Sequence, residues 1–275
     1  MTSALASAAP PEGSVEAAVR PIGPVRLGRH TAALTWRTLT AVRHNPESLF
    51  LLAIQPLLFL VLTTYVYGGQ MVGSSHAYLQ YQVAGILGYN AVFATMSGAP
   101  ALFGDLARGV FDRFRSMPVA RTAPLLARYC GDMCLQMLAF ALVLGLGFAL
   151  GFRVESHWWN IGYVILLMIA FSFGMSWVAM AVATNMRSGE TVQMLSFMCT
   201  FPLVFISGAF VEVNTMPGWL QALVKINPVT WLTASARGLL LGGPVERPVF
   251  YTLVSVLVLA LLFMPLALRG LARRR

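Results

Sequence analysis

Charge is missing from long parts of this sequence. Five stretches contain no Asp, Glu, Lys or Arg, and they cover residues 48–104, 133–152, 156–186, 191–211 and 248–268. Each stretch reaches the roughly 20 apolar residues that a helix needs to cross a bilayer. Backbone groups in lipid must be satisfied internally, and continuous apolar runs without two-residue alternation favour helices over a barrel. The sequence therefore predicts an all-α membrane protein with little chain left for a separate soluble domain.

Lysine and acidic residues are also scarce. The only lysine, Lys225, is not part of the Gly-Lys-Ser/Thr core of a phosphate-binding P-loop. Ion-coupled carriers place ionisable groups inside their spans, whereas here the carboxylates nearest the apolar stretches lie at their ends: Asp105, Asp132, Glu190 and Glu212. The pattern of an intramembrane protease is absent from the sequence as well. These absences argue against ATP hydrolysis, proteolysis and proton or sodium coupling by this chain, for which we predict no catalytic residue.

Cysteine occurs three times and forms no metal motif. Cys130, Cys134 and Cys199 fall at or inside the apolar stretches, and the four histidines lie in distant segments. A structural metal site needs about four converging ligands. We therefore expect the cysteines to be small buried hydrophobic residues, with no disulfide framework and no metal site.

Six spans fit the apolar stretches, because residues 68–75 of the longest one are rich in Gly and Ser and predict a turn. We place the spans at residues 49–67, 83–103, 133–152, 161–183, 194–211 and 249–268, so that the transmembrane domain covers residues 49–268. Residues 1–25 lack the features of a signal peptide and predict a disordered cytoplasmic tail. Residues 269–275 form a basic cytoplasmic tail.

Arginine is distributed unevenly around these spans. Fifteen arginines flank them on one side, and four basic residues lie on the other: Arg153, Lys225, Arg237 and Arg247. The positive-inside rule then places both termini in the cytoplasm. We attribute the net charge of +9 to membrane topology and contact with anionic lipid rather than to nucleic-acid binding.

Aromatic residues on the outer side predict an interfacial belt. Its candidate members are Tyr65, Tyr67, Tyr78, Tyr81, Trp158, Trp159, Tyr163 and Trp219.

Two cytoplasmic segments carry further patterns. Residues 26–48 are amphipathic at helical spacing and predict a helix on the membrane surface. The alternative is an ordinary cluster of arginines that only sets the topology.

The loop of residues 105–131 places Phe111 and Phe114 among arginines. Aromatic and Arg side chains supply much of the energy of protein interfaces, so this loop predicts a protein-docking surface. A solvated basic loop is the alternative. The candidate docking residues are Val110, Phe111, Asp112, Arg113, Phe114, Arg115, Ser116, Met117 and Pro118.

The outer segment of residues 212–247 is too apolar for a simple loop. Its Pro and Gly positions predict two short helices of about a dozen residues each, and a full crossing requires more. We therefore predict a re-entrant helical hairpin before the last span, next to a pathway or a partner subunit, because non-helical backbone needs such cover at membrane depth. Its candidate residues are Pro217, Gly218, Trp219, Asn227, Pro228, Thr230 and Arg237.

These motifs resemble those of the permease subunits of type-2 ATP-binding-cassette (ABC) exporters, above all the daunorubicin/doxorubicin-resistance permeases of actinobacteria. Residues 109–121, with the sequence Gly-Val-Phe-Asp-Arg-Phe-Arg-Ser-Met-Pro-Val-Ala-Arg, are similar to that family's first cytoplasmic loop. Residues 216–220, 227–230 and 237–242 are similar to its outer segment before the last span. Six spans preceded by an interfacial helix complete the resemblance.

The resemblance implies a half-transporter that exports a hydrophobic or amphipathic drug, antibiotic or lipid. Two permease chains, identical or different, would assemble with two cytoplasmic P-loop ATPase chains that bind ATP and Mg. Residues 110–118 would form the coupling helix that docks into the ATPase, and cargo would leave between the permeases along the second and fifth spans. Two alternatives remain open from the residues alone: a secondary carrier or channel, for which we find no inverted repeat, and a non-transporting membrane assembly subunit.

Overall fold

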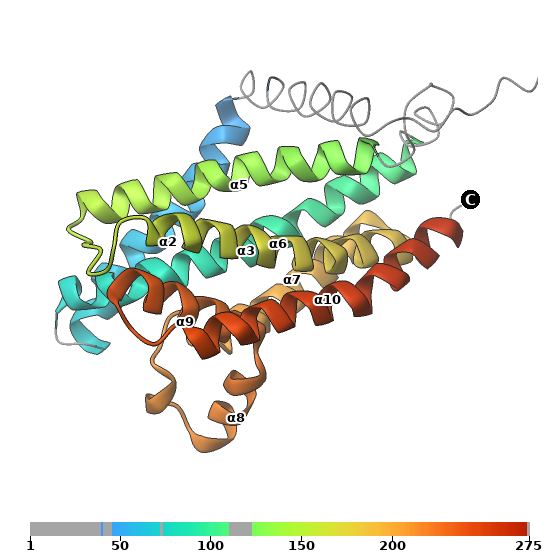
Figure 1. The fold of residues 1–275 in the computed structure, drawn as a ribbon. Helices are drawn as coiled ribbons and strands as arrows, with labels where there is room; N and C mark the ends of the chain where they lie inside the picture. Colours follow the sequence, from blue (N-terminus) through green and yellow to red (C-terminus); the bar gives the residue numbers. More distant parts are fainter. Residues whose placement is uncertain (1–39, 41–45, 72–73, 110–122, 274–275) are drawn as a thin grey trace, which may run out of the picture.

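The computed structural model describes residues 40, 46–71, 74–109 and 123–273, and all regular structure among them is helical. The long helices are α2 (Pro46–Met71), α3 (Ser75–Ala107), α5 (Ala123–Ala149), α6 (Asn160–Asn185), α7 (Gly189–Phe205) and α10 (Glu246–Arg273). The short ones follow α7 and are η1 (Val213–Thr215), α8 (Gly218–Ile226) and α9 (Pro228–Leu241). Figure 1 shows α3, α5, α6 and α10 running side by side, with α2 crossing them obliquely and α8 set apart from them. The predicted all-α class is confirmed.

Successive long helices run in opposite directions, so the bundle has two distinct ends. At one end, Arg128 of α5 reaches Asp105 near the end of α3, and the last turn of α6 meets Gly270 of α10. We call this the arginine-rich end, because it holds Arg108, Arg128, Arg187, Arg269 and Arg273. At the other end, His76 of α3 contacts the Gly151 oxygen after α5, and the Leu239 oxygen of α9 accepts from Ser156 before α6. We call this the hairpin end, because η1, α8 and α9 lie there (Figure 1).

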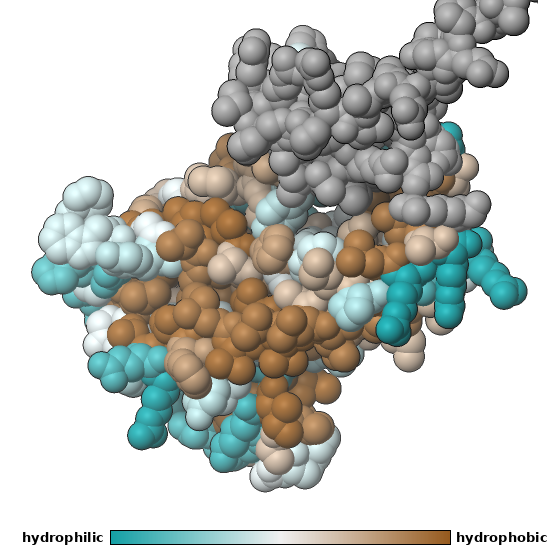
Figure 2. All heavy atoms as spheres, turned by 45° about the vertical axis from the view of Figure 1, so that its right-hand side comes forward, coloured by the Kyte–Doolittle hydropathy of each residue, from teal (hydrophilic) through white to brown (hydrophobic). Residues whose placement is uncertain are grey.

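Within the described residues, four helical segments are long and apolar enough to cross a membrane. They are α3, the Arg128–Ala149 part of α5, α6 and α10. The searched apolar part of α2, Ile54–Gly68, and the 17 residues of α7 are shorter. The space-filling view shows a broad apolar surface between two ends that carry hydrophilic side chains (Figure 2). The chain is thus a multi-pass membrane protein.

The packed core lies around α3 and α6. Every residue of α3 from Gln82 to Val92 is buried, because α2, α5, α6, α7 and α9 all pack against this helix. α10 packs on α6 and α9 and leaves a row of large apolar side chains exposed, among them Leu253, Leu257 and Leu261. That exposed face suits lipid, since hydrocarbon imposes no cost on a leucine side chain.

Local capping fixes where several helices begin and end. The hydroxyl oxygen of Ser74 accepts from the Ala77 amide at the start of α3, and Ser188 accepts from the Thr191 amide at the start of α7, both at 3.1 Å. Gly242 closes α9 in the left-handed region with a φ of 80°, a conformation that costs glycine nothing. Capping residues thus mark helix boundaries that hydropathy alone leaves vague.

Two of our expectations about single side chains are wrong. Cys134 and Cys199 are exposed on their helices and Cys130 is half-buried, so the cysteines are not core residues. Tyr78 is buried and Tyr81 is half-buried, whereas the other six aromatic residues of the expected belt are exposed. These two tyrosines turn inward because their hydroxyls bind backbone carbonyls beyond α7.

Three further expectations concern segments outside the described residues. They are the N-terminal tail, the body of the interfacial helix and the docking residues 110–118.

Candidate functional site: the break after helix α7

The chain leaves helical geometry after α7 until η1 begins at Val213, and we call residues 206–211 of this segment the α7 break. Our expected span reached residue 211, but the helix ends at Phe205, three residues after Pro202. The break lies against α3, because a Cβ atom added at Gly85 would stand only 2.0 Å from the Ala209 carbonyl oxygen. Only glycine allows the two backbones to approach so closely.

Arg237 of α9 holds the α7 break from the hairpin side. Its guanidinium donates to the Gly208 oxygen at 2.6 Å and to the Ala209 oxygen at 2.9 Å. The same group donates to the Tyr81 carbonyl oxygen at 3.1 Å and lies over the Tyr81 ring, 3.4 Å from its centroid. One cation therefore ties α9, α3 and the break together.

Asn227 and two tyrosines satisfy further carbonyl groups of this region. The Asn227 amide donates to the Leu203 oxygen at 2.7 Å and to the Ile206 oxygen at 2.5 Å, while its own oxygen caps α9 at the Val229 amide. The Tyr81 hydroxyl donates to the Gly208 and Val211 oxygens, and the Tyr78 hydroxyl donates to the Phe210 oxygen at 2.9 Å. Irregular backbone with its carbonyls paired to side chains can exist away from water.

The seven predicted hairpin residues separate into two groups. Asn227, Pro228, Thr230 and Arg237 lie on or at the start of α9, which packs against α3, α6 and α10. Pro217, Gly218 and Trp219 lie at the start of α8, where the Trp219 side chain is 71% exposed. The structure therefore brings Asn227 and Arg237 together at the α7 break and leaves the α8 residues on the surface. The tyrosines of α3 are site residues that our sequence reasoning missed.

A continuous row of aromatic rings runs from α7 across the α7 break to α2 and α3. Neighbouring ring centroids are 4.2–5.5 Å apart. The aromatic row consists, in order, of Phe197, Phe201, Phe205, Phe210, Phe59, Tyr89 and Phe93. Its α7 members are exposed, while its α3 members lie in the core or against it. The row therefore presents adjoining apolar rings on an open face of the bundle.

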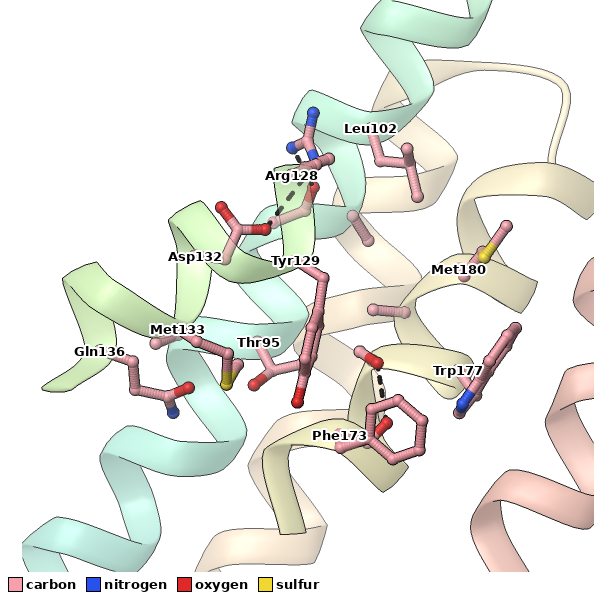
Figure 3. A pocket seen from close by; sticks show the side chains of 15 residues that line it. Thr95, Leu102, Arg128, Tyr129, Asp132, Met133, Gln136, Phe173, Trp177 and Met180 are labelled. Atoms are coloured by element: carbon pink, nitrogen blue, oxygen red, sulfur yellow. Dashed lines mark hydrogen bonds and ion pairs between the residues drawn. The ribbon is translucent and has the colours of Figure 1, made fainter. Parts of the chain in front are cut away.

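A cavity of about 160 Å³ lies between α3, α5 and α6 towards the arginine-rich end. Tyr129 and Phe173 meet edge to face at 5.4 Å on its wall, and Trp177 follows Phe173 at 6.1 Å (Figure 3). The cavity exists because α5 packs mainly on α3 and α2 and hardly touches α6. Its lining suits an apolar group that is larger than a few carbon atoms.

Charged side chains stand at one end of this cavity. Arg128 pairs with Asp105, donates to the Gly98 oxygen at 3.3 Å and approaches the Asp132 carboxylate at 3.8 Å (Figure 3). Arg108 also pairs with Asp105, at 2.7 Å. The spacing of Arg128 and Asp132 predicts contact on one helix face, but no local pattern predicts the pairing with Asp105 across 23 residues.

Comparisons with known proteins agree with this architecture. Residues 29–241 match the family described as ABC-2 type transporter. The chain is 34% identical over 248 residues to the "Daunorubicin resistance ABC transporter permease protein DrrB1" of Streptomyces coeruleorubidus, covering 90% of this chain and 88% of the relative. It is 29% identical over 212 residues to the "Probable doxorubicin resistance ABC transporter permease protein DrrC" of Mycobacterium tuberculosis, covering 73% of each. The chain therefore belongs to the ABC-2 type transporter family, as a permease subunit whose ATPase is a separate chain.

Proposed function

We propose that this permease exports a hydrophobic or amphipathic drug, and that its cargo passes along the aromatic row. The two relatives described above are named for resistance to daunorubicin and to doxorubicin. The aromatic row is the observation that carries the proposal, because the neighbouring rings on the open face of α7 offer apolar contact without fixed polar partners. Offset and edge-to-face ring contacts are worth about 0.5–1.5 kcal/mol each beyond area burial.

A second permease chain completes the pathway in this proposal. The exposed faces of α7 and α2 carry large apolar side chains such as Met194, Met198, Leu58 and Leu62. Two copies placed with these faces towards each other would enclose the aromatic rows between them, and a twofold arrangement is the commonest for such pairs. The second copy is either this chain or a sister permease.

The proposal includes six spans. α2 and α7 join the four longer segments, and α7 alone measures about 25 Å at 1.5 Å per residue. The hydrocarbon core is about 30 Å thick, so the α7 break would lie at membrane depth and complete the crossing. The side chains of Arg237 and Asn227 support this, since they pair carbonyls that water would otherwise satisfy. α8 and α9 then form the re-entrant hairpin, with α9 inside the bundle and α8 at its edge.

We place the arginine-rich end, with both termini, in the cytoplasm. The order of the spans assigns fifteen arginines to this side of the membrane and four basic residues to the other side, which is the asymmetry that the positive-inside rule describes. α3 ends and α5 begins at this end of the bundle, so residues 110–118, which lie between these helices in the sequence, would meet the ATPase there. ATP and Mg would be bound by two ATPase subunits, and their closure would act on the permease through this segment.

Co-purification tests the assembly first. The tagged chain is extracted from its native membrane in mild detergent, with and without nucleotide trapping, and its partners are identified by peptide mass spectrometry. A stoichiometric P-loop ATPase is the expected result. Phe114→Ala and Arg113→Glu should then leave insertion and assembly intact but uncouple ATP hydrolysis from drug efflux. Normal ATP-driven efflux in both variants would contradict the docking role of residues 110–118.

The aromatic row is tested by a matched pair of variants in the reconstituted transporter. Phe201→Ala removes a ring in the middle of the row, whereas Phe250→Ala removes an exposed ring of α10 outside it. Phe201→Ala should lose ring contacts to the drug worth about 1–2 kcal/mol. Its efflux rate for an aromatic drug should therefore be about fivefold to thirtyfold lower than that of the unsubstituted transporter, and Phe250→Ala should keep the unsubstituted rate. Equal rates in the two variants would contradict the proposed path.

A further inference from the structure

A second hollow, separate from the cavity of Figure 3, lies at the arginine-rich end between the ends of α6 and α10. Its volume is about 430 Å³, and it is lined by Thr184, Asn185, Met186, Arg187, Gly270 and Arg273. Arg187 follows the last turn of α6, and Arg273 is the last residue of α10. Two segments far apart in the sequence thus bring two guanidinium groups to one polar depression.

Close helix packing fixes the floor of this hollow. A Cβ atom added at Gly270 would lie 2.6 Å from the Thr184 hydroxyl oxygen and 2.7 Å from the Asn185 side-chain nitrogen. The Asn185 amide also donates to the Leu266 oxygen of α10 at 3.2 Å. These contacts hold α10 against the last turn of α6. Arg273 therefore lies at the end of a packed helix, and Arg187 lies in the three-residue turn that joins α6 to α7.

Both arginines are exposed, and within residues 123–273 neither has an acidic partner within ion-pair distance. The planar guanidinium fork matches the oxygen atoms of a phosphate group, and two such groups around one hollow can bind it together. An arginine that only sets topology needs to lie near the membrane surface but needs no hollow beside it. The geometry therefore favours a bound phosphate over a purely topogenic role.

An apolar surface continues from the hollow along α10. Leu261, Leu262, Leu266 and Leu268 are each exposed by 42% or more and point away from the core. Figure 2 shows hydrophilic side chains at the end of the molecule directly beside this apolar surface. A ligand that uses both surfaces has a phosphate head and hydrocarbon tails. A phospholipid can therefore contact both the arginines and the apolar surface, whereas a free phosphate ion can contact only the arginines.

We propose that the hollow between α6 and α10 binds the phosphate headgroup of an anionic phospholipid, with its acyl chains along the exposed leucines of α10. Arg187 and Arg273 hold the phosphate from two sides. The lipid thereby joins the α6–α7 connection to the end of α10. The site lies away from the aromatic row, so this inference does not depend on the path of the cargo.

The test titrates the purified full-length chain in neutral detergent with phosphatidylglycerol or phosphatidylcholine, and counts bound lipid by native mass spectrometry. Phosphatidylglycerol should bind more tightly and raise the thermal midpoint of the chain. One arginine near an anionic lipid surface contributes about 1 kcal/mol to binding, which is about a fivefold change in affinity for the lipid. Arg187→Gln and Arg273→Gln should therefore each weaken phosphatidylglycerol binding about fivefold. Arg269→Gln is the matched control, because Arg269 lies one turn earlier on α10 but does not line the hollow.

Three results would overturn the proposal. Equal binding of the two lipids would remove the role of the headgroup charge. An equal loss in Arg269→Gln and Arg273→Gln would indicate general attraction to the arginine-rich end rather than a site. A rise in thermal midpoint with inorganic phosphate alone, equal to that with phosphatidylglycerol, would assign the hollow to a soluble anion. If Arg273→Gln does not fold, Arg273→Lys replaces it, since lysine keeps the charge but loses the two-pronged phosphate contact.

Discussion

Replacing Arg237 by methionine perturbs the α7 break at its main point of attachment. Methionine keeps an unbranched apolar side chain but provides no donor. The Gly208 oxygen would keep its bond from the Tyr81 hydroxyl, and the Tyr81 carbonyl lies within α3, where helical bonding continues. The Ala209 oxygen would lose the donor that Arg237 provides at 2.9 Å, with Gly85 packed too closely for water to replace it.

The expected cost follows from these contacts. A buried carbonyl left without a donor costs about 1–3 kcal/mol, and loss of the cation over the Tyr81 ring costs about 0.5–2 kcal/mol. Part of this is offset because methionine no longer requires a charge to be buried. We expect a net loss of about 2–4 kcal/mol. At about 2–4 °C per kcal/mol for a domain of 150–250 residues, the thermal midpoint should fall by about 4–16 °C.

The assay is the thermal midpoint of the purified chain in detergent, followed by size-exclusion chromatography with fluorescence detection. Arg247→Met is the matched control, because it removes an exposed arginine at the same end of the bundle and should change the midpoint by no more than about 2 °C. Arg237→Lys should fall between Arg237→Met and the unsubstituted protein, since lysine keeps the charge without the fork. If Arg237→Met and Arg247→Met unfold at the same temperature, the break does not depend on Arg237 and the reasoning is refuted.

The remaining predictions concern packing and topology. Gly85→Ala should destabilise the chain by about 1–3 kcal/mol or prevent folding, because the new methyl group would collide with the Ala209 carbonyl oxygen. Gly145→Ala is the control in the same thermal assay. It should be neutral or stabilising, because a Cβ atom at Gly145 meets nothing within 4 Å. Thr215→Cys, in a chain without its three native cysteines, should react with an impermeant thiol reagent on intact cells, because η1 lies at the hairpin end. Reaction only after lysis would reverse the proposed orientation.

Helix positions could be predicted because they depend on composition. Each predicted span lies within or largely overlaps one long helix, since a charge-free run can satisfy its backbone only in helical form. The exact ends depend on capping by single side chains such as Ser74 and Ser188, which hydropathy does not register. The two short helices after α7 could also be predicted, because Pro217, Asn227 and Gly242 act through backbone geometry that is local to the chain.

The tertiary partners of the site residues could not be predicted from local patterns. Tyr81 and Arg237 are 156 residues apart, and nothing in the sequence near Tyr81 distinguishes a tyrosine that binds carbonyls from one at a lipid interface. The same holds for Asp105, whose pairing with Arg128 depends on how α3 and α5 cross. For Cys134 and Cys199 we expected burial, and both side chains are exposed. A small apolar residue on a membrane helix can face lipid at no cost, so the residue type does not predict burial.

Helix α3 reaches both ends of the bundle and contacts the candidate site at one of them. α3 has 33 residues and is about 50 Å long at 1.5 Å per residue. Asp105 near one end of α3 holds Arg128 beside the connection that we propose docks on the ATPase, while Tyr81 and Gly85 near the other end hold the α7 break. A movement imposed at the arginine-rich end therefore reaches the break through one helix rather than through a chain of flexible loops. Because four donor side chains secure the break to its neighbours, α3 cannot shift there without moving α9 and the end of α7 with it.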